Sequence, residues 1–303
     1  MTLRWGVDSS FYHADRVVSM DTGRVVGRLN DPQYATVNDR LPQDQGTLYD
    51  YIADHIRAPE FWGRYINWGE TSHAAGKRLR SEEIRYIFQR SARGGTNCRI
   101  LIIYNGIRGQ GGCQTRGRQG YHTGWMDAWK ACAYARNIGV PAGVRIYGNI
   151  EGRWLVSRDW LRGWWDFMDR TEFAGLGGLY GRPAELGPYR DQLRRAMEKD
   201  FLPHARMYPP GRFSMNISRA RKERWASQTP RPPVKTFSDQ FHIWSNTPKH
   251  ECSAAANDIP TGFFAVGPMN ATTVIWQYGY ECMRGYVDMN IATEQGYNDM
   301  WAG

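Results

Sequence analysis

The 303-residue chain lacks most of the short motifs that mark catalytic and binding sites. It has no Cys-x-x-Cys pair and no His-Glu-x-x-His, which excludes the common signatures of zinc sites. Its glycine-rich stretches do not have the spacing of phosphate-binding loops, and no Gly-x-Ser-x-Gly elbow is present. We therefore expect a function that needs no metal and no cofactor.

Long apolar runs are also missing. No run reaches the roughly 18 residues of a membrane-spanning helix, and residues 1–12 resemble a first strand more than a basic and then apolar leader. We expect a protein without a membrane span or signal peptide, which leaves its cell, if at all, by another route.

The charge is unbalanced but not concentrated. The net charge of +9 and the pI near 9.4 favour polyanionic partners, such as nucleic acid, anionic lipid or an acidic cell envelope. Basic residues form only short clusters, at Arg116/Arg118 and Arg219–Arg224, and no nucleic-acid recognition motif accompanies them. The charge is thus typical of a solvated basic face, and we expect no specific nucleic-acid partner.

Cysteines are few and odd in number: Cys98, Cys113, Cys132, Cys252 and Cys282. Reduced, buried thiols are the default interpretation. A Cys98–Cys113 or Cys252–Cys282 bridge is compatible with the spacing, which leaves the pairing open.

Short strand-like runs alternate with helical patterns along most of the chain. Serine or glycine marks the ends of several helices, which are expected from Ser81 to Gly94, over 123–138, from Ser157 and from near Pro188. The eight expected strands are Leu3–Val7, Phe61–Ile66, Ile100–Tyr104, Gly143–Ile150, Ala174–Tyr180, Phe241–Trp244, Val274–Tyr278 and Tyr286–Ile291. This alternation predicts an α/β fold, a TIM-like (β/α) barrel in a single domain over 1–303, with an irregular closing third. Residues 9–58 and 203–236 do not fit it and are interpreted as two loop insertions.

Three carboxylates fall where a barrel would collect them. Asp8 follows the first strand, Glu151 follows the fourth, and Asp288 lies in the last. The ends of barrel strands meet at one mouth, and glycoside hydrolysis needs carboxylates grouped in this way. Each acid also has a structural interpretation: Asp8 in a turn, Glu151 in an ion pair with Arg145 or Arg153, and Asp288 as a turn cap.

These residues carry a resemblance to a known family. WGVDSSFYHAD at the start, IYGNIEG at 146–152 and VIWQYGYECMRGYVDMNIA at 274–292 resemble the strand motifs of the family-25 glycoside hydrolases, the lysozymes or muramidases. FWGRYI (61–66), MDAWKACAYARNIGVPAGVRIY (126–147) and GGLYG (177–181) resemble a related glycoside-hydrolase-like family, domain of unknown function 1906. That family is found in actinobacterial envelope proteins and phage proteins.

The resemblance implies roles for individual residues. Glu151 matches the general acid, and Asp8 and Asp288 match assisting carboxylates. Asn149 stands where family-25 enzymes have an aspartate, and its amide lacks that charge but can hydrogen-bond an N-acetyl group.

Five further residues are candidates for substrate binding. The rings of Tyr147, Trp276 and Tyr278 suit the faces of sugars, although each ring is also suited to the core. Arg64 is expected to point into the mouth and hold Asp8 or Glu151, and Asn105 follows the third strand towards the same mouth.

Two functions follow. The first is a hydrolase of peptidoglycan or a related envelope polysaccharide, as a phage tail-associated or lytic protein. The alternative is a weak or inactive glycan-binding module of the virion, for example a minor tail protein, which Asn149 favours. The expected partners are cell-wall glycan and other phage tail proteins.

Overall fold

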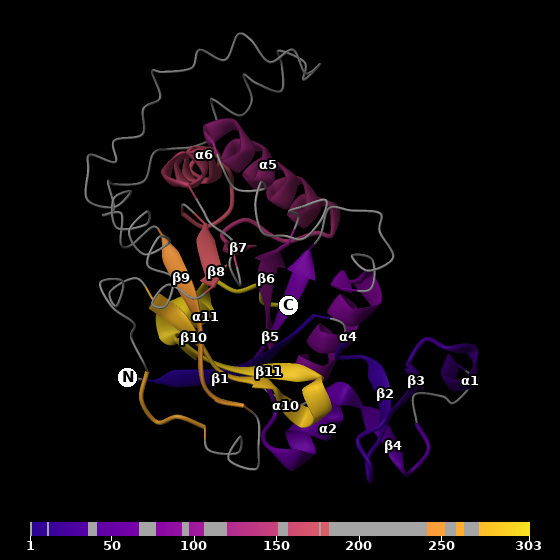
Figure 1. The fold of residues 1–303 in the computed structure, drawn as a ribbon. Helices are drawn as coiled ribbons and strands as arrows, with labels where there is room; N and C mark the ends of the chain where they lie inside the picture. Colours follow the sequence, from indigo (N-terminus) through magenta and orange to yellow (C-terminus); the bar gives the residue numbers. More distant parts are fainter. Residues whose placement is uncertain are drawn as a thin grey trace, which may run out of the picture.

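The computed structural model describes residues 2–10, 12–35, 41–66, 77–92, 97–105, 120–150, 157–175, 177–181, 241–251, 259–263 and 273–303. Eight strands close into a barrel at its centre, in the order β1-β11-β10-β9-β8-β7-β6-β5 (Figure 1). The barrel strands are β1 (Leu3–Ser9), β5 (Phe61–Ile66), β6 (Arg99–Tyr104), β7 (Ile146–Asn149), β8 (Gly178–Gly181), β9 (His242–Glu251), β10 (Thr273–Glu281) and β11 (Val287–Thr293). Every one overlaps a strand predicted from the sequence.

Strand direction confirms the expected irregular closure. β1 and β5 to β10 run parallel to their neighbours, whereas β11 is antiparallel to both β10 and β1. Only a short turn, α10 (Cys282–Gly285), joins β10 to β11. A connection of this length can only reverse the chain, because a parallel return needs a crossover of a dozen residues or more.

Three helices cover the early strands from outside: α4 (Ser81–Ala92), α5 (Tyr121–Asn137) and α6 (Arg158–Met168). Each lies where a helix was predicted, and Ser157 caps α6 by accepting a hydrogen bond from the Trp160 N–H. α5 and α6 cross closely, since a Cβ on Gly163 would come within 1.9 Å of the Tyr121 carbonyl oxygen. The helix predicted near Pro188 lies outside the described residues.

The barrel strands are buried on both faces, as in other parallel barrels. Side chains on one face of each strand pack among the helices, for example Trp62 with Ile102. Those on the other face form a separate interior cluster that includes Phe61, Leu101, Tyr147, Tyr180 and Trp244. Glycine makes room for these interior rings, since a Cβ on Gly178 would lie 2.5 Å from the ring of Tyr147.

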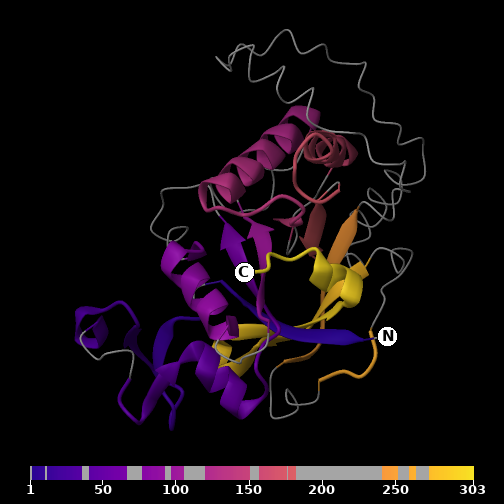
Figure 2. The same ribbon diagram turned by 180° about the vertical axis from the view of Figure 1, so that it is seen from behind.

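The first insertion has regular structure of its own. Its elements are β2 (Arg16–Ser19), β3 (Val25–Arg28), α1 (Pro32–Ala35), β4 (Gln45–Thr47) and α2 (Leu48–His55). The strands form a three-stranded antiparallel sheet in the order β3-β2-β4, called the small sheet below. It stands beside the barrel on the side of α4 (Figure 2). The second insertion, 203–236, lies outside the described residues.

Polar contacts tie the C-terminal segment to the amino-terminal ends of the strands. Asp299 Oδ2 lies 2.7 Å from Arg145 Nε on the loop before β7 and 2.8 Å from His242 Nδ1 on β9. Beyond α11 (Glu294–Asn298), the backbone of Trp301 pairs with that of Ile100 in β6. Burial raises the pKa of Asp299, but His242 and Arg145 outweigh it and lower the pKa. Charged groups at this end of a barrel stabilise the fold and leave the opposite end for chemistry.

The described cysteines correct two expectations. Cys98 and Cys132 are buried thiols that form no disulfide, so the Cys98–Cys113 bridge is wrong. Cys282 is disulfide-bonded and is therefore not the reduced thiol of the default interpretation. Cys252, its suggested partner, lies outside the described residues.

Within the described residues, no helix is both long and apolar enough to cross a membrane.

Candidate active site at the carboxyl end of the barrel

The carboxyl ends of β1 and β5 to β10 and the amino end of β11 meet at one end of the barrel, because β11 runs in the opposite direction. Asp8 is next to last in β1 and Asp288 is second in β11, and the two are cross-strand partners in register. Side chains directly opposite in an antiparallel pair share a face, with Cβ atoms about 4.5–5.5 Å apart. The structure thus brings two of the three predicted carboxylates together.

A hydrogen-bonded relay holds Asp8. Asn290 Nδ2 in β11 donates to Asp8 Oδ1 (2.7 Å), and Trp244 Nε1 in β9 donates to Asn290 Oδ1 (2.9 Å). An indole N–H can only donate, so it orients the Asn290 amide with its NH₂ towards the carboxylate. Asp8 is 1% exposed, and its orientation is therefore set by the barrel interior and not by solvent.

Asp288 has a structural contact as well. Its Oδ1 accepts a hydrogen bond (2.7 Å) from the backbone N–H of Glu281, which has a φ of 53° at the start of the β10–β11 turn. This is the turn-capping interpretation that its sequence also allowed. Asp288 is only partly buried, in contrast to Asp8.

Asp8 and Asn290 begin a line of polar side chains on the barrel interior, called the polar wall below. Three residues that the sequence did not single out extend it. The hydroxyl of Tyr180 in β8 donates to Gln277 Oε1 in β10 (2.6 Å) and accepts from Asn246 Nδ2 in β9 (3.1 Å). All three are buried. Gln277 lies between two rings that face the other way, so strand alternation places it inside once the face of those rings is known.

Two predicted residues lie on β7, on the interior side. Asn149 is buried and pairs in register with Tyr180. Tyr147 is buried inside the barrel with its ring edge-on to Trp244, 6.1 Å between centroids. Its hydroxyl has no hydrogen-bond partner among the described residues, and burial raises its pKa. Glu151, two residues after β7, lies outside the described residues.

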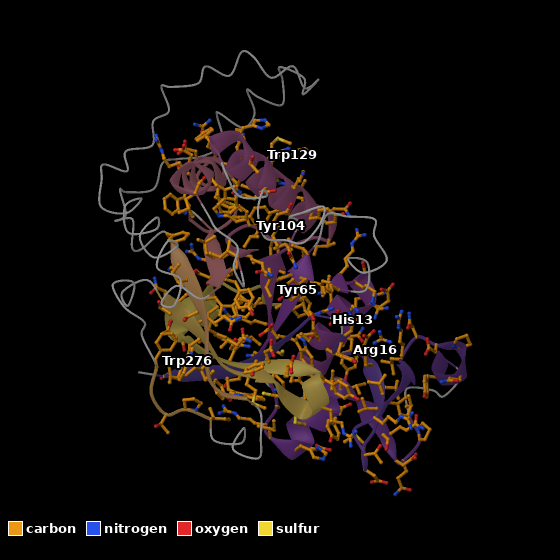
Figure 3. All side chains as sticks on the ribbon, in the orientation of Figure 1. His13, Arg16, Tyr65, Tyr104, Trp129 and Trp276 are labelled. Atoms are coloured by element: carbon orange, nitrogen blue, oxygen red, sulfur yellow. The ribbon has the colours of Figure 1, made fainter. Side chains whose placement is uncertain are left out.

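The two rings predicted on β10 face away from the interior. Trp276 (Figure 3) and Tyr278 are buried in the outer hydrophobic cluster. The Tyr278 hydroxyl accepts a hydrogen bond from Trp5 Nε1 (2.8 Å). Both are core residues, which corrects the expectation that they stack on sugar.

Asn105 follows β6 and is partly buried, with its backbone N–H bonded to the Ile66 carbonyl (3.3 Å).

Arg64 is also corrected. It lies on the outer face of β5 and forms an ion pair with Glu83 of α4, with 2.9 Å between Arg64 Nε and Glu83 Oε1. It also donates to the Ser9 carbonyl oxygen. It does not hold Asp8, because side chains on β5 alternate and position 64 faces the helices.

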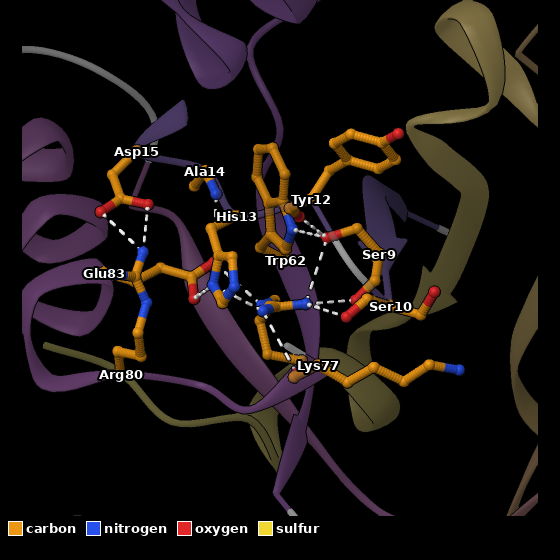
Figure 4. Close-up of polar contacts among 11 residues, drawn as sticks. Ser9, Ser10, Tyr12, His13, Ala14, Asp15, Trp62, Lys77, Arg80 and Glu83 are labelled. Carbon is orange, nitrogen blue, oxygen red and sulfur yellow. Dashed lines mark hydrogen bonds and ion pairs between the residues drawn. The ribbon is translucent and has the colours of Figure 1, made fainter. Parts of the chain in front are cut away.

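Glu83 is the centre of a polar cluster outside the barrel (Figure 4). The cluster consists of the buried residues His13, Asp15, Arg64 and Glu83 and the partly buried Arg80. Its carboxylate accepts from His13 Nδ1 (2.6 Å) and from the Ala14 backbone N–H (3.0 Å). Burial alone would raise the pKa of Glu83, but Arg64 and these hydrogen bonds lower it to about 2. The cluster joins the small sheet to the barrel and is structural.

Among the described residues, no group of three or more histidine, cysteine or acidic side chains is placed to hold a metal ion. The polar wall offers carboxylates, amides and a phenol, a set that suits hydrogen-bonding to hydroxyl and acetamido groups.

Comparison with known proteins supports the fold. No family model and no curated protein matches the chain. An uncharacterized B. stearothermophilus protein of known structure is 20% identical, with a TM-score of 0.61 over 98% of this chain and 100% of that one. The chain is also similar to the Mycobacterium tuberculosis Tat-secreted protein Rv2525c in complex with L-tartrate, at 13% identity and a TM-score of 0.48 over 99% of this chain and 100% of that one. Its complex with HEPES is 14% identical with a TM-score of 0.47, over 99% of each chain.

Proposed function

We propose that this barrel is a glycoside hydrolase that acts on bacterial cell-wall glycan. The observation that carries the proposal is the register of Asp8 with Asp288 at the barrel mouth, beside a wall of buried amides and a tyrosine hydroxyl. Glycoside hydrolysis uses carboxylates gathered around the scissile bond. The geometry around Asp8 supports such a role, because a carboxylate fixed by a relay is pre-oriented for a reacting centre.

In this proposal Glu151 is the general acid, which protonates the leaving oxygen, as the family resemblance implies. Asp8 stabilises charge that develops on the sugar, and Asn290 and Trp244 position it. Asn149 hydrogen-bonds the substrate. Asp288, opposite Asp8 in the register, assists as a second carboxylate.

A binding module is the second candidate, and two observations favour it. Asn149 supplies an amide where the family-25 enzymes, which the sequence resembles, have a carboxylate. One carboxylate oxygen of Asp288 accepts a hydrogen bond from the backbone N–H of Glu281. A module of this kind would hold wall glycan without cleaving it. In either form we place the chain in a phage tail or lysis apparatus, which detection by mass spectrometry in purified particles would support.

The test compares purified wall digestion by the wild type, Glu151→Gln, Asp8→Asn and the control Asp21→Asn, an exposed acid of the small sheet. Loss of an acid/base group costs about 10²–10⁴-fold. We expect both site variants to lose reducing-sugar release while still co-sedimenting with walls, and Asp21→Asn to match the wild type. Release that survives in both site variants overturns the hydrolase. Wall binding without release in every protein supports the module, and Asn149→Asp is then the substitution expected to restore cleavage.

A further inference from the structure

Two arginines of the small sheet face each other. Arg16 in β2 and Arg28 in β3 are cross-strand partners in register. Like charges directly opposite in an antiparallel pair repel and destabilise the sheet. Such an arrangement is unfavourable unless an anion compensates it.

Among the described residues, no carboxylate forms an ion pair with Arg16. Its guanidinium has neither an ion pair nor a hydrogen bond with any described residue, and its Nε is buried without an acceptor there. The carboxylates of Asp15 and Asp31 lie near enough to Arg16 to raise its pKa, but neither forms an ion pair with it. Asp15 binds Arg80 Nη2 through both oxygens (3.1 and 3.2 Å), and Asp31 accepts the Arg28 backbone N–H (2.7 Å).

A third arginine adds to the positive field. Arg80, just before α4, has a buried Nε that also lacks a hydrogen-bond partner in the described part of the chain. Burial lowers the pKa of Arg16, and the charges of Arg28 and Arg80 lower it further, whereas those of Asp15 and Asp31 raise it. Figure 3 shows Arg16 close to His13, on the side of the barrel away from Trp276.

We propose that Arg16, together with Arg28 and Arg80, binds a phosphate group. Each guanidinium offers a planar fork of donors that fits phosphate oxygens, and facing guanidiniums suit a ligand with several oxygens and more than one charge. Inorganic phosphate, a phosphodiester polymer of the envelope and a phospholipid headgroup share this chemistry. The site is separate from the barrel mouth and does not depend on the proposed hydrolase.

Isothermal titration at constant ionic strength tests the site, with sodium phosphate as the first probe and chloride as the background. The variants are Arg16→Gln and the control Arg24→Gln, which removes the same charge from an exposed position of the same hairpin. A charge-assisted hydrogen bond is worth about tenfold or more in affinity. We expect Arg16→Gln to lose at least that much and Arg24→Gln to match the wild type.

Two further arms identify the source of the phosphate. A glycerol phosphate oligomer and phosphatidylglycerol vesicles replace inorganic phosphate in these arms. The probe that binds the wild type most tightly, and loses affinity in Arg16→Gln, identifies the source of the phosphate. Equal affinity in Arg16→Gln and the wild type for all three probes overturns the proposal. Without ligand, Arg16→Gln should melt at or above the wild-type temperature, since it removes a repulsion. A lower melting temperature would make Arg16 structural and would also overturn the site.

Discussion

Replacement of Glu83 by glutamine should be among the most destabilising single changes on the surface between α4 and the barrel. Glu83 and Arg64 are both fully buried and form an ion pair across that surface. Glutamine keeps the size of the side chain and can still hydrogen-bond His13 or Ala14. It removes the only carboxylate that pairs with Arg64 among the described residues.

The expected magnitude follows from the charge that is left behind. Removal of one partner of a buried ion pair costs about 3–5 kcal/mol, because the other charge stays buried without compensation. At about 2 °C per kcal/mol for a chain of this size, the melting temperature should fall by about 6–10 °C. Replacement of both partners, as in Glu83→Gln with Arg64→Met, should recover much of the loss, since no charge then remains buried.

The same carboxylate should contribute to acid unfolding. Its pKa in the folded protein is about 2, against an ordinary value of 4.5. The unfolded chain therefore binds the proton first as the pH falls. The contribution of Glu83, about 3 kcal/mol, is complete above pH 4.5 and is lost as the pH falls towards 2. Burial lowers the pKa of His13, so protonation of the unfolded histidine below its ordinary value of 6.5 adds a loss of the same sign.

Urea unfolding at pH 7 and at steps down to pH 3 measures both effects. The matched control is Glu82→Gln, the exposed neighbour on the same helix, which should change stability by less than about 1 kcal/mol. A cost of Glu83→Gln no larger than that of Glu82→Gln would refute the argument. So would a double variant in which the two single costs simply add, because an ion pair requires coupling.

Two further outcomes test the packing. Gly163→Ala should destabilise the protein by about 1–3 kcal/mol in thermal unfolding, because its Cβ would clash with α5, whereas Gly262→Ala, with open space around it, should not. Equal melting temperatures would contradict the close helix crossing. Cys98 and Cys132 should resist iodoacetamide at pH 8 in the native protein and react after unfolding, since burial raises the pKa of both thiols, that of Cys132 to about 12. Peptide mass spectrometry locates the label, and rapid native labelling at either cysteine would show that it is not buried.

The strands were predictable because each is a short apolar run bounded by turn residues. Phe61–Ile66 was predicted residue for residue, and Ile100–Tyr104 differed by one position. The helix starts near Ser81 and Ser157 followed from capping chemistry, which is local. The placement of Asp8 and Asp288 at the mouth required only the barrel rule that strand ends converge.

The faces of the strands were not predictable in the same way. A barrel strand is buried on both sides, so its sequence has no polar–apolar contrast to show which side is interior. Arg64, Trp276 and Tyr278 were therefore expected at the mouth, but they face outwards. Gln277, between the two rings, faces inwards and was missed.

The sequence by itself determined the order and nature of the barrel elements and the ends of the strands that carry carboxylates. Tertiary structure decided which side chains meet: the Asp8–Asn290–Trp244 relay, the Arg64–Glu83 ion pair and the facing arginines of the small sheet. The physical reason is that periodicity and capping act within a few residues, whereas these contacts join positions brought together only by closure of the barrel and by the register of strands.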